Sequence, residues 1–188
     1  MRVAIIPARG GSRRLPRKAL RLFRDRPVIA WSIEAARACR LCDVVAVSTD
    51  DDEIASVARA EGAAVIERPA ALAQDDVGTQ EVVRHALRVL PAEQALCLYP
   101  CAPLVAPADL MRGWRALHVP GTAYAVPAGS WLADPGAFYW GWAWAFRDRA
   151  PLLGEHTVLI PIDERRAVDI NTQEDWAEME AMYEAITR

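Results

Sequence analysis

Short apolar runs alternate with stretches of helical periodicity along most of this 188-residue chain. A strand that is covered on both faces is apolar throughout, whereas a helix that packs on a sheet is apolar on one side only. Regular alternation of the two patterns is typical of a mostly parallel α/β sheet. The sequence therefore predicts a three-layer fold, formed by residues 1–188 as a single domain.

Prolines, glycines and capping residues set the limits of the expected elements. Pro27 opens a helix and Gly62 ends one. Asn171 or Thr172 caps the last helix, and Asp175 completes a loose capping box with Thr172. Strands are expected at residues 2–7, 44–48, 64–66, 95–99, 122–126, 158–162 and 167–170, and helices at 27–40, 52–61, 79–90, 108–117 and 172–186.

A loop rich in glycine and arginine follows the first expected strand. It contains the adjacent residues Gly10, Gly11 and Ser12 together with five cations. Adjacent glycines let backbone N–H groups turn inward around an anion, and cationic side chains neutralise phosphate charge. The loop therefore predicts a site for a triphosphate. Its cations are Arg9, Arg13, Arg14, Arg17 and Lys18.

The charge distribution places this loop at a basic pole. Residues 1–26 carry nine of the 22 Lys and Arg residues and one of the 25 Asp and Glu residues. Their net charge is +8, against −11 for the rest of the chain. Aromatic residues do not alternate with these cations as they do on a nucleic-acid-binding surface. A phosphate-sized anion therefore fits the pattern better than a nucleic acid.

Lys18 is the only lysine in the chain. A composition biased toward arginine explains this without any function. Alternatively, the site needs a compact ammonium group that a planar guanidinium does not replace. The sequence leaves both explanations open.

Polar residues also follow the second and third expected strands. The carboxyl ends of parallel strands face a common ligand crevice, and Asp50 and Arg68 lie at these ends. Arg68 is expected either in this crevice or in solvent. Thr49 or Asp50 is expected to cap the helix at 52–61, and capping together with favourable charge at a helix N-terminus explains Asp51 and Asp52. Thr79 begins the next expected helix, where it either caps the helix or contacts a ligand.

Aromatic residues gather in two segments. Tyr99 ends the fourth expected strand, where it either contacts a ligand or packs. Residues 138–146 place five large rings on alternate positions, which would form one face of a sheet if the segment were extended throughout. Core packing is the usual reason for such a stripe. Four of the seven tryptophans lie within residues 131–144, so an oligomer interface, such as that of a homodimer, is the alternative.

Asp169 and Asn171 are the candidate metal ligands. They lie two positions apart, so on a strand both side chains point to the same side and can hold Mg²⁺ bound to phosphates. A strand end followed by a helix cap explains the same residues, because asparagine is a good cap.

Other functional classes find little support in the sequence. The three histidines have no nucleophile close to them in the sequence, as a hydrolase triad would require. The pair Cys39 and Cys42 ends an expected helix rather than starting one, which does not fit a redox motif, so reduced thiols are expected. No signal peptide fits and no apolar run could span a bilayer, so a cytoplasmic protein without a membrane partner is expected.

The order of the motifs resembles that in CMP-sialic acid synthetases. The motifs are I-P-A-R-G-G-S-R-R-L-P-R-K at 6–18, S-T-D-D-D-E-I-A at 48–55, E-R-P-A-A-L-A at 67–73, P-L at 103–104 and D-I-N-T-Q-E-D-W at 169–176. The segment D-P-G-A-F-Y-W-G at 134–141 is most similar to bacterial pseudaminic acid cytidylyltransferases. The first motif is the most specific, and the likeness extends over most of the chain.

This resemblance implies a Rossmann-like sheet of the nucleotide-diphospho-sugar transferase type. It also implies transfer of CMP from CTP to a nonulosonic sugar acid, with Mg²⁺ as cofactor and pyrophosphate as the second product. Arg9 and Lys18 would be the catalytic residues. By matching position, the nucleotide would be bound by Ala8, Arg9, Gly10, Gly11, Ser12, Arg13, Lys18, Arg68 and Thr79, the acceptor by Tyr99, Phe138 and Tyr139, and the metal by Asp169 and Asn171.

Three departures from the family pattern leave alternatives open. Ala19 stands where the family has an asparagine that reads the cytosine, and Asn171 stands where it has a carboxylate. The chain is also shorter around residues 127–136, a region that in relatives helps to form the acceptor pocket and the dimer arm. The alternatives are a smaller acceptor, such as a phosphonate or a short ulosonate, and a non-catalytic relative that binds nucleotides.

Overall fold

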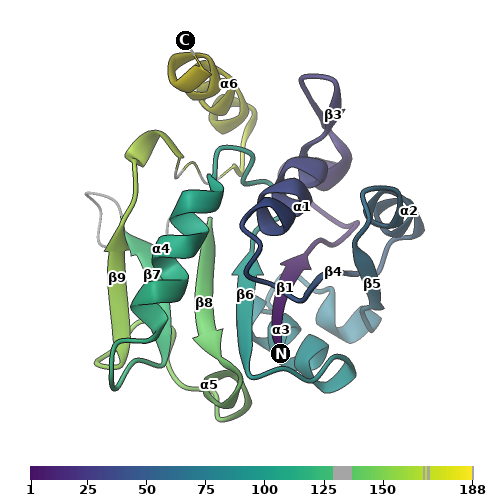
Figure 1. The fold of residues 1–188 in the computed structure, drawn as a ribbon. Helices are drawn as coiled ribbons and strands as arrows, with labels where there is room; N and C mark the ends of the chain where they lie inside the picture. The colour runs from purple at the N-terminus through teal and green to yellow at the C-terminus, as the bar shows by residue number, and fades with distance from the viewer. Residues whose placement is uncertain (129–136, 167, 169, 188) are drawn as a thin grey trace.

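A seven-stranded sheet lies at the centre of the computed structural model, which describes residues 1–128, 137–166, 168 and 170–187 (Figure 1). Its strand order is β5-β4-β1-β6-β8-β7-β9. All neighbouring strands are parallel except for the two pairs made by β8, which confirms the predicted mostly parallel sheet. The strands are β1 (Arg2–Pro7), β4 (Val44–Thr49), β5 (Ala64–Glu67), β6 (Gln94–Leu98), β7 (Tyr124–Ala128), β8 (Phe138–Trp142) and β9 (Thr157–Pro161).

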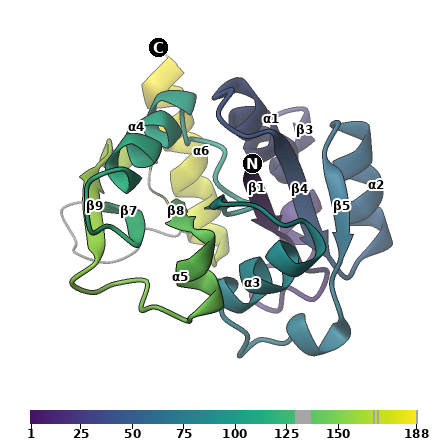
Figure 2. The same cartoon turned by 60° about the horizontal axis from the view of Figure 1, so that its bottom comes forward.

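Helices cover both faces of the sheet, as the predicted three layers require (Figures 1 and 2). In β1, Ala4 and Ile6 join one core cluster, while Val3 and Ile5 join the other. This division follows from the strand itself, because successive side chains point to opposite faces. The first face carries α1 (Val28–Ala38), α2 (Asp52–Ala60) and α4 (Pro107–Leu117), and the second carries α3 (Thr79–Val89) and α5 (Ala143–Arg147).

A third cluster joins distant parts of the chain beyond the carboxyl ends of the parallel strands. The hairpin of β2 (Leu22–Phe23) and β3 (Arg26–Pro27) packs there against α6 (Gln173–Thr187). The sequence did not predict this hairpin. Its turn residue Arg24 has a φ of 55°, a conformation that usually calls for glycine or asparagine, so the common turn signal is missing.

One expected strand is wrong, and the aromatic segment is only partly extended. The aromatic segment 138–146 is not extended throughout, because β8 ends at Trp142 and α5 begins at Ala143. The strand expected at 167–170 is wrong at its two residues in the described part of the chain. Val168 and Ile170 belong to no strand, and the Ile170 carbonyl accepts a hydrogen bond from the Lys18 ammonium group instead.

None of the helices in the described ranges combines the length and the apolar character needed to cross a bilayer.

Candidate functional site

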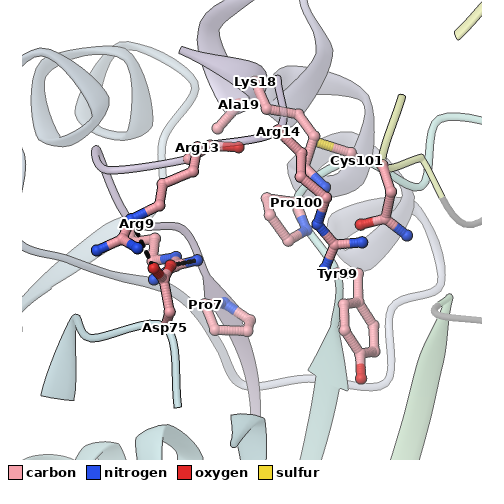
Figure 3. A pocket seen from close by; sticks show the side chains of 12 residues that line it. Pro7, Arg9, Arg13, Arg14, Lys18, Ala19, Asp75, Tyr99, Pro100 and Cys101 are labelled. Atoms are coloured by element: carbon pink, nitrogen blue, oxygen red, sulfur yellow. Dashed lines mark ion pairs between the residues drawn. The ribbon is translucent and has the colours of Figure 1, made fainter. Parts of the chain in front are cut away.

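A pocket of about 400 Å³ opens at the carboxyl ends of β1 and β6. The position fits the general rule that ligands of open α/β sheets bind at this edge. Figure 3 shows Arg9 and Arg13 on one side of the pocket, Arg14 and Tyr99 on the other, and Lys18 and Ala19 between them. The lining residues are Pro7, Arg9, Ser12, Arg13, Arg14, Lys18, Ala19, Asp75, Tyr99, Pro100, Cys101 and Asn171.

Backbone contacts hold the glycine-arginine loop against the end of β4. The Ala8 N–H donates to the Ser48 carbonyl at 3.0 Å, and the Gly10 N–H donates to Asp50 Oδ1 at 3.1 Å. The Ser12 N–H donates to the Gly10 carbonyl at 3.1 Å. These three N–H groups are therefore used to shape the loop, and the predicted inward-facing nest of backbone donors does not form at these positions. The pocket instead owes its positive charge to side chains.

Gly10 is needed because of a close approach, not because of its backbone angles. A Cβ atom at this position would lie 2.5 Å from Asp51 Oδ2. The cap of α2 is Asp51 rather than the expected Thr49 or Asp50, and its carboxylate accepts the N–H groups of Glu53 at 3.0 Å and Ile54 at 2.9 Å. Its carboxylate also pairs with the guanidinium of Arg17 at 2.5 Å. The cap of α2 thus fixes both ends of the loop.

Asp75 joins two arginines of the loop across one side of the pocket. Its Oδ1 lies 2.5 Å from Arg9 Nη2, and its Oδ2 lies 2.7 Å from Arg13 Nε (Figure 3). Arg9 Nη1 also donates to the Ala73 carbonyl at 3.2 Å. Sequence analysis missed Asp75, because no strand end or helix cap marks its position between the 3₁₀ helix at Ala70–Leu72 and α3.

Lys18 connects the pocket to the segment before α6. Its ammonium group donates to the Ile170 carbonyl, and the next residue, Asn171, lines the pocket. Arg21 strengthens the same connection, with its guanidinium 4.5 Å from the centre of the Trp176 ring. The single lysine therefore occupies a position where a compact donor reaches a backbone carbonyl at the pocket wall.

The helix cap and the candidate metal ligands are separate residues in this segment. Thr172 caps α6, because the Asp175 N–H donates to Thr172 Oγ1 at 3.2 Å and the Thr172 N–H donates to Asp175 Oδ2 at 2.7 Å. Hydrogen bonds from the Asn171 and Thr172 N–H groups lower the pKa of Asp175. Asn171 thus lines the pocket without serving as the cap. Asp169 lies outside the described residues.

Arg68 is buried rather than solvated, with 7% of its surface exposed. Its Nη2 donates to the Ser48 carbonyl at 2.5 Å, and its Nε donates to Ser48 Oγ at 3.3 Å. Burial lowers the pKa of Arg68 to about 10, so the guanidinium remains charged at neutral pH. Arg68 does not line the main pocket. It lies with Asp50 in a neighbouring depression of about 200 Å³.

Three hydroxyl groups extend from the pocket wall into the core. Thr79 is the first residue of α3 and not its cap, which is Gly78. Thr79 Oγ1 lies 2.9 Å from the Tyr139 hydroxyl and 3.5 Å from that of Tyr99, the residue that lines the pocket. Phe138 and Tyr139 are fully buried in the two main core clusters. Their contact with an acceptor remains a prediction, and their burial gives them a packing role.

Comparison with known proteins places this geometry in a family. A family model described as cytidylyltransferase matches residues 3–124, which include the whole glycine-arginine loop and the strands that carry it. The chain belongs to the cytidylyltransferase family. Over 109 residues it is 40% identical to the pseudaminic acid cytidylyltransferase of Campylobacter jejuni, an alignment that covers 55% of this chain and 47% of the relative. The chain thus spans about half the length of that relative.

Solved structures of similar fold extend the comparison to nearly the whole chain. One is a CMP:2-keto-3-deoxy-manno-octonic acid synthetase in complex with CTP, with a TM-score of 0.79, 16% identity and coverage of 98% of this chain and 99% of that one. Another is a Mycobacterium tuberculosis protein in complex with manganese. Its TM-score is 0.71 at 19% identity, and the alignment covers 96% of this chain and 98% of that one. At these identities the likeness shows the fold, here the nucleotidyltransferase sheet.

Proposed function

We propose that this protein transfers CMP from CTP to a sugar acid of the nonulosonic type and releases pyrophosphate. The observation that carries the proposal is the pocket at the carboxyl edge of the sheet, where one loop contributes four cations. These are Arg9, Arg13, Arg14 and Lys18. Membership of the cytidylyltransferase family and the likeness to a pseudaminic acid enzyme support the choice of nucleotide and of acceptor class.

The triphosphate is the part of the substrate that this pocket fits best. One guanidinium group can donate two parallel hydrogen bonds to two phosphate oxygens. Each such charge-assisted hydrogen bond is about twice as strong as a neutral one. Arg9 and Lys18 are the residues we assign to the reacting phosphates, because they enter the pocket from opposite ends of the loop. The loop residues Ala8 to Arg13 shape the remainder of this subsite.

The nucleoside and the acceptor are assigned to the rest of the pocket wall. Arg68 and Thr79 do not line the pocket and would support nucleotide binding through the residues they contact. Arg68 is buried beside Asp50, and Thr79 lies 3.5 Å from the Tyr99 hydroxyl. Tyr99 would contact the acceptor directly because it lines the pocket. Phe138 and Tyr139 would then support Tyr99 from the core.

The reaction consists of one displacement at phosphorus. An acceptor hydroxyl oxygen attacks the α-phosphorus of CTP in line, a new P–O bond forms, and the bond to the β-phosphate oxygen breaks. The proton of the hydroxyl passes to solvent or a base, and pyrophosphate carries away the displaced electron pair. In such reactions the protein acts mainly through positioning and charge neutralisation. The cations of the loop neutralise charge on the leaving pyrophosphate.

Mg²⁺ is the proposed cofactor, and the lining of the pocket is compatible with it. Mg²⁺ usually takes one or two protein oxygens and completes its coordination with phosphates and water. Asn171 offers one amide oxygen at the pocket, with Asp169 as its proposed companion. Within the described part of the chain, no three His, Cys, Asp or Glu side chains group together to hold a metal by themselves. The ion would neutralise phosphate oxygens when bound.

Pyrophosphate release from purified protein tests the proposal. The assay contains CTP, Mg²⁺ and a panel of nonulosonic acids, short ulosonates and phosphonates, with UTP and ATP as controls for base selectivity. Release that requires both CTP and a nonulosonic acid supports the proposal. Release only with a smaller acid favours the alternative acceptor. Binding of CTP by calorimetry without turnover across the panel contradicts the enzymatic function. Sedimentation of the same sample tests the proposed homodimer.

A further inference from the structure

Asp75 is the only acidic residue in the described lining of a pocket that otherwise carries cations. Its two carboxylate oxygens are divided between two arginines of the glycine-arginine loop, at 2.5 Å from Arg9 Nη2 and 2.7 Å from Arg13 Nε. Two oxygens of a phosphate group would contact a pair of guanidinium groups in the same way. The carboxylate therefore occupies the place of an anionic ligand.

The surroundings of Asp75 allow this contact to open. The carboxylate belongs to a connecting segment between the 3₁₀ helix and α3, and 38% of its side chain is exposed. Arg13 is 85% exposed, so its guanidinium loses little hydration in that ion pair. Exposed ion pairs of this kind are weak and are easily exchanged for a stronger partner. A polyphosphate carries more charge than a carboxylate and is such a partner.

We propose that Asp75 is an exchangeable counter-anion that positions Arg9 and Arg13 when no nucleotide is bound. The inference rests on the proposed function, because it requires a polyphosphate to enter this pocket. Phosphate oxygens and the carboxylate repel each other, so binding of the triphosphate breaks both ion pairs and displaces Asp75. When pyrophosphate leaves, the carboxylate returns to the two arginines. Asp75 thus lowers the affinity for polyphosphates and favours their release.

Calorimetric titration with CTP and with inorganic pyrophosphate tests this role. Asp75→Asn removes the competing charge and is expected to tighten pyrophosphate binding about tenfold, the combined effect of one exposed and one partly buried ion pair. Asp76→Asn is the matched control. It removes the same charge one residue away, and within the described lining Asp76 does not face the pocket. It is expected to change the affinity less than twofold at the same ionic strength.

Two further variants separate this contact from a general effect of charge. In an Arg13→Gln background, Asp75→Asn is expected to tighten binding less, because one of the two ion pairs is already missing. Asp75→Glu keeps the carboxylate and is expected to keep an affinity near that of the original protein. Circular dichroism confirms that each variant is folded.

Each outcome of these titrations decides at least one of the two proposals. If the original protein binds CTP but Asp75→Asn binds pyrophosphate no more tightly than Asp76→Asn, the role of Asp75 is wrong and the proposed function stands. If Asp75→Asn weakens binding, the carboxylate is part of the ligand site and the proposed exchange is wrong. If the original protein binds neither CTP nor pyrophosphate, both proposals are wrong.

Discussion

The two halves of the sheet use their side chains in different ways. In the half formed by β5, β4, β1 and β6, polar groups at the strand ends hold the glycine-arginine loop. In the half formed by β8, β7 and β9, rings fill the interior, and Tyr124, Tyr139 and Phe146 contact one another. The family match ends at residue 124, where β7 begins. The family match thus covers the half that carries the glycine-arginine loop, whereas packed rings fill the other half.

The largest effect is expected from Lys18→Ala in the first half. Removing one preorganised donor to a developing charge typically lowers turnover by about 10²- to 10³-fold. We therefore expect most pyrophosphate release to be lost while the circular dichroism spectrum is unchanged. Lys18→Arg keeps the charge and tests whether the single lysine is there by chance. Full activity of Lys18→Ala would show that the phosphate role of this residue is wrong.

Gly141→Ala is expected to have the largest effect in the second half, on stability. A Cβ atom at this position would lie 2.5 Å from Tyr124 Cδ1 and 2.7 Å from Phe146 Cε2, inside packed rings. Overpacking of a core costs about 1–3 kcal/mol in the free energy of unfolding, which chemical denaturation measures. In Gly154→Ala, the matched control, the nearest atom outside the adjacent residues is Pro151 Cβ at 3.7 Å, and stability should change little. An equally stable Gly141→Ala would mean that the aromatic half is loosely packed.

Tyr139→Phe tests the point where the two halves meet. It removes a hydroxyl 2.9 Å from Thr79 Oγ1, and burial raises the pKa of Tyr139 well above its usual range, so the group is neutral. We expect a loss of about 1 kcal/mol in unfolding free energy and a rise of several-fold in KM for CTP. Tyr124→Phe is the control, because Tyr124 is also a fully buried tyrosine and its hydroxyl contacts Gln80 at 3.0 Å. Equal KM values for the two variants would exclude a positioning role for Tyr139.

The smallest effect is expected from Asp51→Ala, at the cap of α2. Burial alone would raise the pKa of Asp51. The hydrogen bonds from the Ile54 and Glu53 N–H groups and the ion pair with Arg17 have a larger effect, so the pKa is lowered overall. A carboxyl group with a lowered pKa stabilises the fold at pH values above its pKa in the unfolded chain, which is about 4. This contribution is lost as the pH falls through the pKa of the group in the folded protein. Asp51→Ala should therefore cost about 1 kcal/mol at neutral pH and less in acid. A cost independent of pH would contradict this.

The first half of the fold was largely predictable from the sequence because its signals are local. Continuous apolar runs marked β1, β4 and β6. Outside this half, Thr172 and Asp175 marked the start of α6 in the same local way. The hairpin was missed because its turn uses Arg24 where glycine is usual. The position of β8 between β6 and β7 could not be predicted, because antiparallel insertion depends on contacts between distant segments.

The candidate site was predicted in part, for a similar reason. The five cations of the loop follow directly from the sequence, and four of them line the pocket, whereas Arg17 pairs with Asp51 instead. The predicted backbone nest was not found at Gly10 and Ser12, because Asp50 and the loop itself take their N–H groups. Asp75 carries no local signal at all. Its role depends on ion pairs to residues more than sixty positions earlier, which only the folded chain brings together.

The contact of Lys18 with the Ile170 carbonyl joins residues 152 positions apart. On the ribosome, the glycine-arginine loop is therefore synthesised long before the carbonyl that holds its lysine. A nascent chain can complete the strands around β1 and still lack this contact, so the part of the pocket wall that Asn171 forms is added only after residue 171 has been synthesised.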